Sequence, residues 1–393
     1  MKNRSHLMAT YAEPTVTFVS GSGTTLIDDQ GKEYLDFLCG LAVTSLGHAR
    51  PEVTSAIADQ ANTLSHVSNL FANELGPEVA DLIDGLLTTA TGTSGRVFLC
   101  NSGAEANECA LKLARRVQPG KHAVITTLDS FHGRTLATLT ATGQPAKHEP
   151  FQPLPEGFSY VPFGDLTAMK ARLAIGDVAA VLVECIQAEG GGNVPEKGYL
   201  SGVEAACREA GALFMVDEVQ AGLGRTGQWF SFQDEGLTPD VVTMAKALGN
   251  GFPVGACWAK ADVADCFGPG DHGSTFGGQP LAMAAVKATL ATMIDIDAPN
   301  AAASASAHLV SSLSDLDGIV AVRGRGLLLG AVLSAPVAGA VAASALKDGL
   351  IVNAVRPDVI RLTPPLTVSS EEIDEAVRRL GVILHETMGS TQS

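Results

Sequence analysis

Short apolar runs of strand length alternate with segments of helical pattern along the middle of the chain, and this alternation constrains the fold more than any other feature. The runs that suit central strands are residues 97–100, 123–126, 180–183, 213–216, 241–244 and 254–258. The segments that suit helices packed on a sheet are 104–117, 203–210 and 280–294. Strands covered by helices on both faces read as continuous apolar runs. The pattern therefore predicts an α/β fold with a mostly parallel, helix-covered sheet.

The two ends of the chain follow other patterns. From about Pro299 the pattern is helix, strand, helix, strand and a final amphipathic helix from Glu371, which is typical of a smaller α+β domain. The first fifty residues suit hairpins, with turn residues at 28–31. We predict three parts: an N-terminal segment at 1–50 that packs with the small domain, a large domain at 51–298, and the small domain at 299–393.

Charge and cysteine content limit the classes of function. The formal net charge of -16 disfavours nucleic acid or an anionic membrane as a partner, because both bind clustered Lys and Arg. Segment 326–346 carries no charge, but Pro336 interrupts it, and we interpret it as a strand followed by a buried helix. The 7 cysteines form no C-x-x-C pair and no apolar stretch follows residues 1–5, which together predict a cytoplasmic protein. The 9 histidines show no metal-binding spacing, so no metal is predicted.

Polar residues directly follow two of the predicted strands. Asp217 comes after the run 213–216, and Lys246 comes after the run 241–244 in a glycine-rich turn that ends at Gly251. Because α/β sheets bind ligands in the crevice beyond the carboxyl ends of their strands, we expect these side chains to lie in one site.

A third polar group stands between a predicted strand and a predicted helix. Ser102, Gly103 and Ala104 lie where free backbone N–H groups and the helix dipole suit a phosphate, although Ser102 serving only as a helix cap is about equally consistent with this turn alone. Together with Asp217 and Lys246, they make up the phosphate site, acid and lysine that a pyridoxal cofactor requires.

Two longer strings make the pattern specific. Residues 217–227 (DEVQAGLGRTG) and 245–251 (AKALGNG) resemble the signature of class III aminotransferases, and the similarity runs from about Tyr11 to Leu380. The resemblance implies the fold-type I architecture of pyridoxal-phosphate-dependent transferases. It also implies a transaminase whose cofactor is pyridoxal 5'-phosphate.

The resemblance assigns roles to residues around the cofactor. Lys246 would bind the cofactor aldehyde and then transfer protons, and Asp217 would keep the pyridine nitrogen protonated. Val219 would pack on one face of the ring, Gln220 would lie near the phenolic oxygen, and Phe131 would stack on the opposite face. Ordinary core packing is the alternative for Phe131.

Other positions matched to the family extend the site and depart from it in two places. His132, in the string FHGRT at 131–135, would help to order the cofactor loop. Thr275 resembles the threonine that reaches the phosphate of the neighbouring subunit's cofactor, which implies a homodimer. Gln279 stands where the family usually has Asn, and Cys185 stands where it usually has Pro.

The substrates implied by the resemblance carry carboxylates, which arginines bind in a forked geometry. Arg361 would bind the α-carboxylate of glutamate, and Glu189 would pair with it in the first half-reaction and release it in the second. Arg134 would hold the carboxylate of the amino donor. The alternative for Arg361 is a structural ion pair, and the alternative for Arg134 is a cation that anchors its loop. We predict that Ser68, Asn69 and Ser274 line the pocket.

Four segments, at 11–16, 40–43, 46–48 and 66–71, most resemble acetylornithine aminotransferases, and Leu41 stands where ornithine enzymes carry a tyrosine. The resemblance implies reversible transfer of the distal amino group of N2-acetylornithine to 2-oxoglutarate, giving N-acetylglutamate 5-semialdehyde and glutamate, in arginine biosynthesis. Succinylornithine, N-succinyl-diaminopimelate or another ω-amino substrate stays open. An aminomutase, a decarboxylating enzyme and a non-catalytic regulator that binds pyridoxal phosphate are more distant alternatives.

Overall fold

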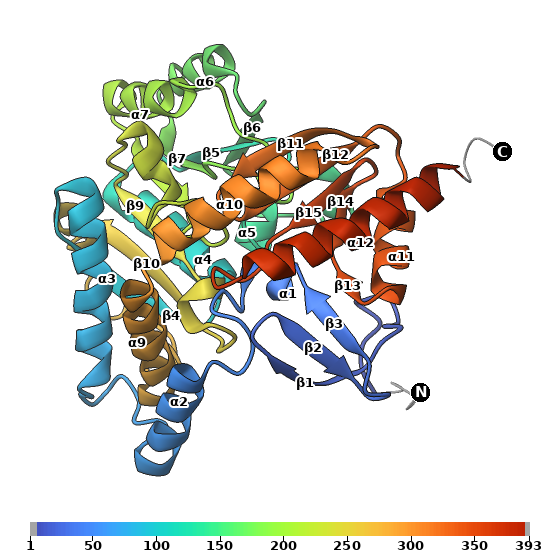
Figure 1. Ribbon diagram of the computed structural model, residues 1–393. Coiled ribbons are helices and arrows are strands. Elements are labelled where there is room, and N and C mark those ends of the chain that lie inside the picture. Colours follow the sequence, from blue (N-terminus) through green and yellow to red (C-terminus); the bar gives the residue numbers. More distant parts are fainter. Residues whose placement is uncertain (1–5, 390–393) are drawn as a thin grey trace.

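The computed structural model describes residues 6–389, so residues 1–5, on which part of the location prediction rests, lie outside the described residues. Within 6–389 the strands form three sheets (Figure 1). The largest has the order β4-β10-β9-β8-β7-β5-β6, and the two smaller sheets have the orders β11-β12-β15-β14 and β1-β2-β3-β13.

The central sheet is mostly parallel, as predicted. Its strands are β4 (Gly95–Cys100), β5 (Ala123–Thr127), β6 (Phe158–Val161), β7 (Val178–Val183), β8 (Leu213–Asp217), β9 (Val241–Met244) and β10 (Gly255–Lys260). The pairs from β6 to β9 are parallel, and β10 runs antiparallel to both β4 and β9. Strand β6 was not predicted, because three of its four residues are only partly buried and its sequence is not a continuous apolar run.

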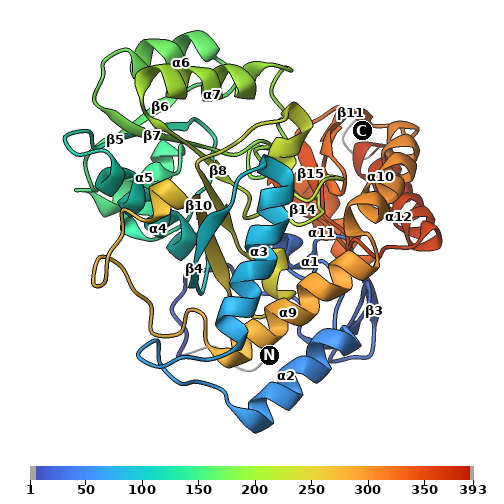
Figure 2. The same ribbon diagram turned by 90° about the vertical axis from the view of Figure 1, so that its left-hand side faces the viewer.

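Both faces of this sheet are covered, which explains the continuous apolar runs. Along β8, Phe214 and Val216 pack into one core cluster, whereas Leu213 and Met215 pack into another on the opposite face. The covering helices are α2 (Pro51–Thr63), α3 (Leu75–Thr91), α4 (Gly103–Val117), α6 (Leu166–Leu173), α7 (Tyr199–Ala210) and α9 (Pro280–Asp295). Figure 2 shows α2, α3 and α9 side by side, in agreement with their contacts.

The C-terminal part alternates helices and strands. Its elements are α10 (Ala298–Ser314), β11 (Ile319–Arg325), β12 (Leu328–Leu333), α11 (Ala338–Lys347), β13 (Leu350–Ile351), β14 (Asn353–Arg356), β15 (Val359–Leu362) and α12 (Ser370–Gly389). The uncharged segment 326–346 forms β12 and most of α11, as interpreted from the sequence. None of the described helices combines the length and the apolar character needed to cross a membrane.

The N-terminal residues form the predicted hairpins and lie beside the C-terminal part (Figure 1). Strands β1 (Phe18–Ser22), β2 (Thr25–Asp28) and β3 (Glu33–Asp36) are antiparallel, and β3 pairs in parallel with β13. The remaining short elements are α1 (Cys39–Ala42), α5 (Leu136–Ala141), η1 (Pro145–Lys147), η2 (Glu149–Phe151), η3 (Ser231–Glu235), η4 (Lys246–Gly249) and α8 (Ala261–Ala264).

Candidate active site

A cavity of about 400 Å³ opens where β8 and β9 end and α4 begins. Its volume lies in the range of small-molecule and cofactor sites. The predicted residues that line it are Ser102, Gly103, Ala104, Phe131, His132, Arg134, Asp217, Val219, Gln220 and Lys246. Segments that lie more than a hundred residues apart in the sequence therefore meet at one crevice, as expected for the carboxyl edge of a parallel sheet.

The N-terminus of α4 forms one end of this cavity. Ser102 caps the helix, since its hydroxyl accepts a hydrogen bond from the Glu105 N–H at 3.1 Å. The first helical residues, Gly103 and Ala104, have no intrahelical acceptor for their N–H groups. Gly103 also lets Val219 pack closely against this turn, because a Cβ at position 103 would lie 2.7 Å from Cγ1 of Val219. The cap and a free anion site therefore occur together.

Asp217 is held by donors from three directions. Its Oδ2 accepts a hydrogen bond from Asn107 Nδ2 at 2.8 Å and lies 2.8 Å from His132 Nδ1, and its Oδ1 accepts one from the Val219 N–H at 3.0 Å. Asn107 is fixed in turn by Thr243, whose hydroxyl donates to its Oδ1 at 2.7 Å. The carboxylate is thus fixed at the end of β8. Sequence reasoning missed Asn107, whose only signal was a polar residue on the buried face of α4.

His132 leaves one ring nitrogen available. Its Nε2 is buried and has no hydrogen-bond partner among the described residues, although the residue lines the cavity. In a neutral imidazole, a proton on Nδ1 that is donated to Asp217 leaves Nε2 as an acceptor. An unpartnered buried polar atom at a cavity wall is typical of a ligand site.

Lys246 follows β9 as predicted and adopts a left-handed backbone conformation, with φ of 46°. This conformation is unfavourable for a residue with a side chain and is typical of functional positions. Burial lowers the pKa of Lys246 to about 8, because the attraction of Glu189 and Asp217 only partly offsets it. A larger fraction of this amine is therefore neutral near pH 7 than for an ordinary lysine.

Glu184, at the end of β7, is a second buried carboxyl at the cavity. Burial, reinforced by the charge of Asp217, holds the pKa of Glu184 well above its usual range. Its Oε2 accepts a hydrogen bond from the Phe131 N–H at 3.2 Å. The side chain therefore positions the loop that carries the aromatic ring. No sequence pattern indicated a functional role for Glu184.

Arg361 and Glu189 form a closed ion pair next to the cavity. Arg361 is only 3% exposed, and its Nη1 donates to Glu189 Oε1 and, at 3.2 Å, to Gln220 Oε1. Its Nη2 donates to Asn353 Oδ1 at 2.9 Å. Burial alone would raise the pKa of Glu189, but the charge and hydrogen bond of Arg361 outweigh it and lower the pKa. The pair is therefore ionised.

Besides Arg361 and Glu189, which lie next to the cavity, four predicted residues, Ser68, Asn69, Ser274 and Thr275, do not line it in the single chain. Asn69 Nδ2 donates to the carbonyl oxygen of Ser274 at 3.0 Å, and Thr275 lines a separate pocket. Ser68 belongs to the same loop, which Gln279 holds by accepting from the Ser68 N–H at 3.1 Å. This bond gives the family departure at Gln279 a clear local function, and the structure suggests no role for the other departure, Cys185, which is fully buried.

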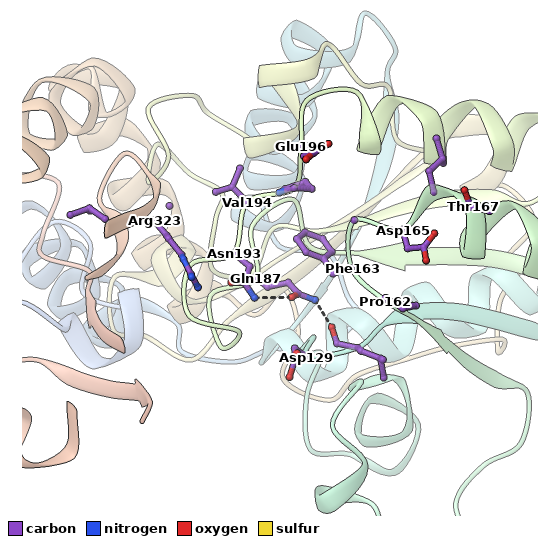
Figure 3. Close-up of a pocket in the computed structure, with 16 residues that line it drawn as sticks. Asp129, Pro162, Phe163, Asp165, Thr167, Gln187, Asn193, Val194, Glu196 and Arg323 are labelled. Carbon is purple, nitrogen blue, oxygen red and sulfur yellow. Dashed lines mark hydrogen bonds between the residues drawn. The ribbon is translucent and has the colours of Figure 1, made fainter. Parts of the chain in front are cut away.

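A larger groove, of about 1240 Å³, lies behind the loop that carries Glu189 (Figure 3). The base of the loop is fixed there by Gln187, whose Nε2 donates to the Leu128 carbonyl at 2.8 Å and to Thr127 Oγ1 at 3.0 Å. The groove contains no lysine and none of the predicted site residues. We therefore assign the chemistry to the smaller cavity, where Lys246 and Asp217 meet.

Arg225 lies beneath the site and was also missed. It is 1% exposed, and its guanidinium donates to Ser45 Oγ at 2.8 Å, to the Leu327 carbonyl at 3.2 Å and to the Pro364 carbonyl. Pro364 follows β15, the strand that carries Arg361. Arg225 therefore joins the loop after β8 to the N-terminal segment and to the strand of Arg361.

Known proteins share this arrangement over nearly the whole chain. The chain is 47% identical over 385 residues to an acetylornithine aminotransferase from Corynebacterium efficiens, with 97% of this chain and 95% of that protein covered. It is 44% identical over 388 residues to an acetylornithine aminotransferase from Methanothermobacter thermautotrophicus, with 98% and 97% covered.

Solved structures of known aminotransferases are also similar to this chain over nearly its whole length. The ornithine aminotransferase from Toxoplasma gondii superimposes with a TM-score of 0.92 at 32% identity, covering 98% of this chain and 94% of that one. The N-acetylornithine aminotransferase from Stenotrophomonas maltophilia gives 0.84 at 35% identity, covering 96% and 98%. The sequence model described as aminotransferase class-III matches residues 8–384. The chain therefore belongs to the class III aminotransferases, a family of transaminases that implies pyridoxal phosphate as cofactor.

Proposed function

We propose that this protein is an acetylornithine aminotransferase. It would transfer the distal amino group of N2-acetylornithine reversibly to 2-oxoglutarate, giving N-acetylglutamate 5-semialdehyde and glutamate, as a step of arginine biosynthesis. Relatives with that name at 44% to 47% identity support the proposal. The observation that carries it is the closed pair of Arg361 and Glu189 beside Lys246, because a masked arginine suits an amino donor that has no carboxylate next to its reacting amine.

The cavity fits pyridoxal 5'-phosphate, which supplies an aldehyde that carries the amino group and a ring that accepts electrons. The unpartnered His132 Nε2 at the cavity wall supports this fit. The residues that would hold the group are Lys246 at the aldehyde, Asp217 at the ring nitrogen, Val219 and Phe131 at the two faces, Gln220 near the phenolic oxygen, His132 in the surrounding loop, and Ser102, Gly103 and Ala104 at the phosphate.

Within this site, Lys246 moves the proton and Asp217 provides a negative charge at a fixed position. Lys246 has a pKa near 8, so its neutral amine can remove a proton from the substrate carbon and return it. Asp217 is fixed by Asn107 and His132 and so presents a carboxylate of constant position to the ring nitrogen. Both groups act without large movement, which is what preorganised catalysis requires.

The two half-reactions place opposite demands on Arg361. While Glu189 pairs with Arg361, the pocket next to Lys246 is closed to an α-carboxylate, and an ω-amino donor enters instead. When Glu189 turns away, Arg361 becomes free to bind the α-carboxylate of glutamate or 2-oxoglutarate. Arg134, at the cavity wall, would hold the distant carboxylate of the donor.

The residues outside the single-chain cavity support a homodimer. Ser68, Asn69, Ser274 and Thr275 lie near Leu70, Phe71 and Phe276, which are 86%, 67% and 65% exposed. Large exposed apolar side chains are typical of a surface that a partner covers. We propose that Thr275 reaches the phosphate of the neighbouring subunit's cofactor and that Ser68, Asn69 and Ser274 line that subunit's pocket. A purely monomeric mass in sedimentation would exclude this arrangement.

Two further expectations are kept as proposals. We propose that the protein works in the cytoplasm, since the 7 cysteines are free and six of them are buried. We also propose that residues 1–50, 51–298 and 299–393 act as an N-terminal segment, a large domain and a small domain.

A substrate panel tests the proposed function. Purified protein with pyridoxal phosphate and 2-oxoglutarate is given N2-acetylornithine, N-succinylornithine, N-succinyl-diaminopimelate, ornithine or γ-aminobutyrate, and glutamate is measured. Highest kcat/KM with N2-acetylornithine is expected. A higher kcat/KM with a succinylated amine would favour a succinylornithine or N-succinyl-diaminopimelate aminotransferase instead. Absence of glutamate with every donor would overturn the proposal and leave the non-transaminating alternatives, an aminomutase, a decarboxylating enzyme or a non-catalytic regulator that binds pyridoxal phosphate.

A further inference from the structure

Lys147 lies beside Phe131, one of the residues that line the candidate active site. It ends η1, and its Nζ lies 5.2 Å from the ring centroid of Phe131, which lines the cavity. The guanidinium of Arg134 lies 5.7 Å from the same ring centroid. Two cations therefore converge on one aromatic ring at the cavity wall.

The charges around this ring are not balanced. Arg361 is paired with Glu189, and Arg356 is paired with Asp129 at 2.5 Å. Among the described residues, by contrast, neither Arg134 nor Lys147 has a carboxylate within ion-pair distance. Within residues 6–389 the ammonium of Lys147 donates a hydrogen bond only to the amide oxygen of Gln144.

The charge of Arg134 acts unfavourably on the charge of Lys147, and an anion bound near both would relieve this repulsion. Burial lowers the pKa of Lys147, and the charges of Arg134 and Arg356 lower it further. The charge of Lys147 also acts on Glu189, whose charge in turn acts on Lys246. Lys147 is therefore close enough to influence the reacting end of the site, and it is half-buried rather than free in solvent.

We propose that Lys147 is a second carboxylate-binding cation, which together with Arg134 holds the carboxylate of the amino donor that lies far from its reacting amine. The inference deepens the proposed function and rests on it for the identity of the donor. A carboxylate bound beside the Phe131 ring would neutralise both cations at once. It would also fix how far the donor's reacting amine extends toward Lys246. Lys147 would then contribute to substrate specificity.

The competing explanation is a structural one. Gln144 donates through its Nε2 to the Ser130 carbonyl at 2.9 Å, so Lys147 could act only by steadying this loop beside Phe131. A structural role would alter every substrate alike. A carboxylate-binding role would alter only substrates that carry the carboxylate, and it would be restored by another cation.

The test compares two ligands that differ only in that group. N2-acetylornithine is compared with N-acetylputrescine, which has the same acylated chain and the same reacting amine but lacks the carboxylate. N-acetylputrescine is measured as a donor, or as a competitive inhibitor where its turnover is slow. The variants are Lys147→Met, Lys147→Arg and, as a matched exposed control on α6, Lys170→Met.

For Lys147→Met we expect KM for N2-acetylornithine to rise about fivefold, the value of a partly exposed ion pair, with kcat nearly unchanged. The constants for N-acetylputrescine should not change, Lys147→Arg should restore most of the affinity, and Lys170→Met should behave as wild type. An equal effect on both ligands, or no effect on either, overturns the inference.

If the protein is not an acetylornithine aminotransferase, the experiment gives a result that differs from failure of the inference about Lys147. In that case the wild-type protein does not convert N2-acetylornithine, and Lys147 is judged on glutamate, whose far carboxylate would meet the same two cations. A KM for glutamate that is unchanged in Lys147→Met would then overturn the inference about Lys147 separately.

Discussion

Arg361 donates a hydrogen bond to Glu189 across the edge of the candidate active site, although 172 positions separate the two residues in the chain. Arg361 comes from β15 and Glu189 from the loop after β7, so the pair joins the C-terminal sheet to the central sheet. Because the charges of both residues act on Lys246, we propose that the pair is a gate that either accepts or excludes an α-carboxylate.

Opening this pair should change the preference between the two amino donors. In Glu189→Gln the charge that masks Arg361 is lost, so glutamate should gain over N2-acetylornithine by about tenfold in the ratio of half-reaction rates, as expected for a hydrogen-bonded ion pair worth ~1.5 kcal/mol. Single-turnover measurement with each donor gives the ratio. An unchanged ratio would show that Glu189 does not control access to Arg361.

Removal of the lysine should abolish turnover and change how the cofactor is held. For Lys246→Ala we expect a loss of at least about a thousandfold in kcat, because both the nucleophile and the proton carrier disappear. The cofactor should then wash out on dialysis in borohydride-treated samples, whereas wild type should retain it covalently. The exposed Lys170→Ala should resemble wild type in both assays, and residual activity above a tenth in Lys246→Ala contradicts the assignment.

The lowered pKa of Lys246 predicts a pH dependence of cofactor uptake. The amine is the reactive form, and its fraction rises with pH through the value of about 8. Uptake of pyridoxal phosphate by cofactor-free protein should therefore accelerate with a midpoint near pH 8 and level off roughly one to two pH units above it. Stopped-flow absorbance measures the rate. A midpoint near the ordinary lysine value would mean that burial does not tune this amine.

Glu218 predicts a pH dependence of stability. Burial raises the pKa of Glu218 to about 7, although Ser231 donates to its Oε1 at 2.6 Å. A raised folded-state pKa gives stability that is complete below the unfolded value and is lost as the pH rises through about 7. Glu218→Gln keeps the acceptor and removes the charge, so it should be more stable than wild type by about 3 kcal/mol at pH ~8.5 and nearly equal at pH ~4. Urea unfolding at the two pH values measures this difference; an equal difference at both contradicts the buried charge.

Replacement of Arg225 should lower the stability of the fold and should also disturb the position of Arg361. Arg225→Met leaves Ser45 and the carbonyl oxygens of Leu327 and Pro364 without their donor, which should cost about 1–3 kcal/mol. The same change loosens the chain after β15, so KM for 2-oxoglutarate should rise. Denaturant unfolding and steady-state kinetics measure the two effects. The partly exposed Arg116→Met, whose ion pair with Asp271 lies at the surface, is the matched control and should show neither.

The sequence by itself determined the central sheet, because strands buried on both faces have to be continuous apolar runs. The predicted run 241–244 coincides with β9, and the run 213–216 lacks only Asp217 of β8. It also determined that Asp217 and Lys246 would meet, since the ends of neighbouring parallel strands share one edge. β6 was missed because its partial burial leaves no such run.

Only the tertiary structure decided the contacts that depend on distant segments. Asn107, Glu184 and Arg225 carry no pattern of their own, and they matter because folding buries them beside Asp217, Phe131 and the end of β15. The same holds for Lys147, which has no carboxylate partner in the described part of the chain, a fact that is visible only when the neighbouring charges have been placed. Periodicity records local burial along one element, whereas hydrogen bonds and charge balance between elements are fixed by packing.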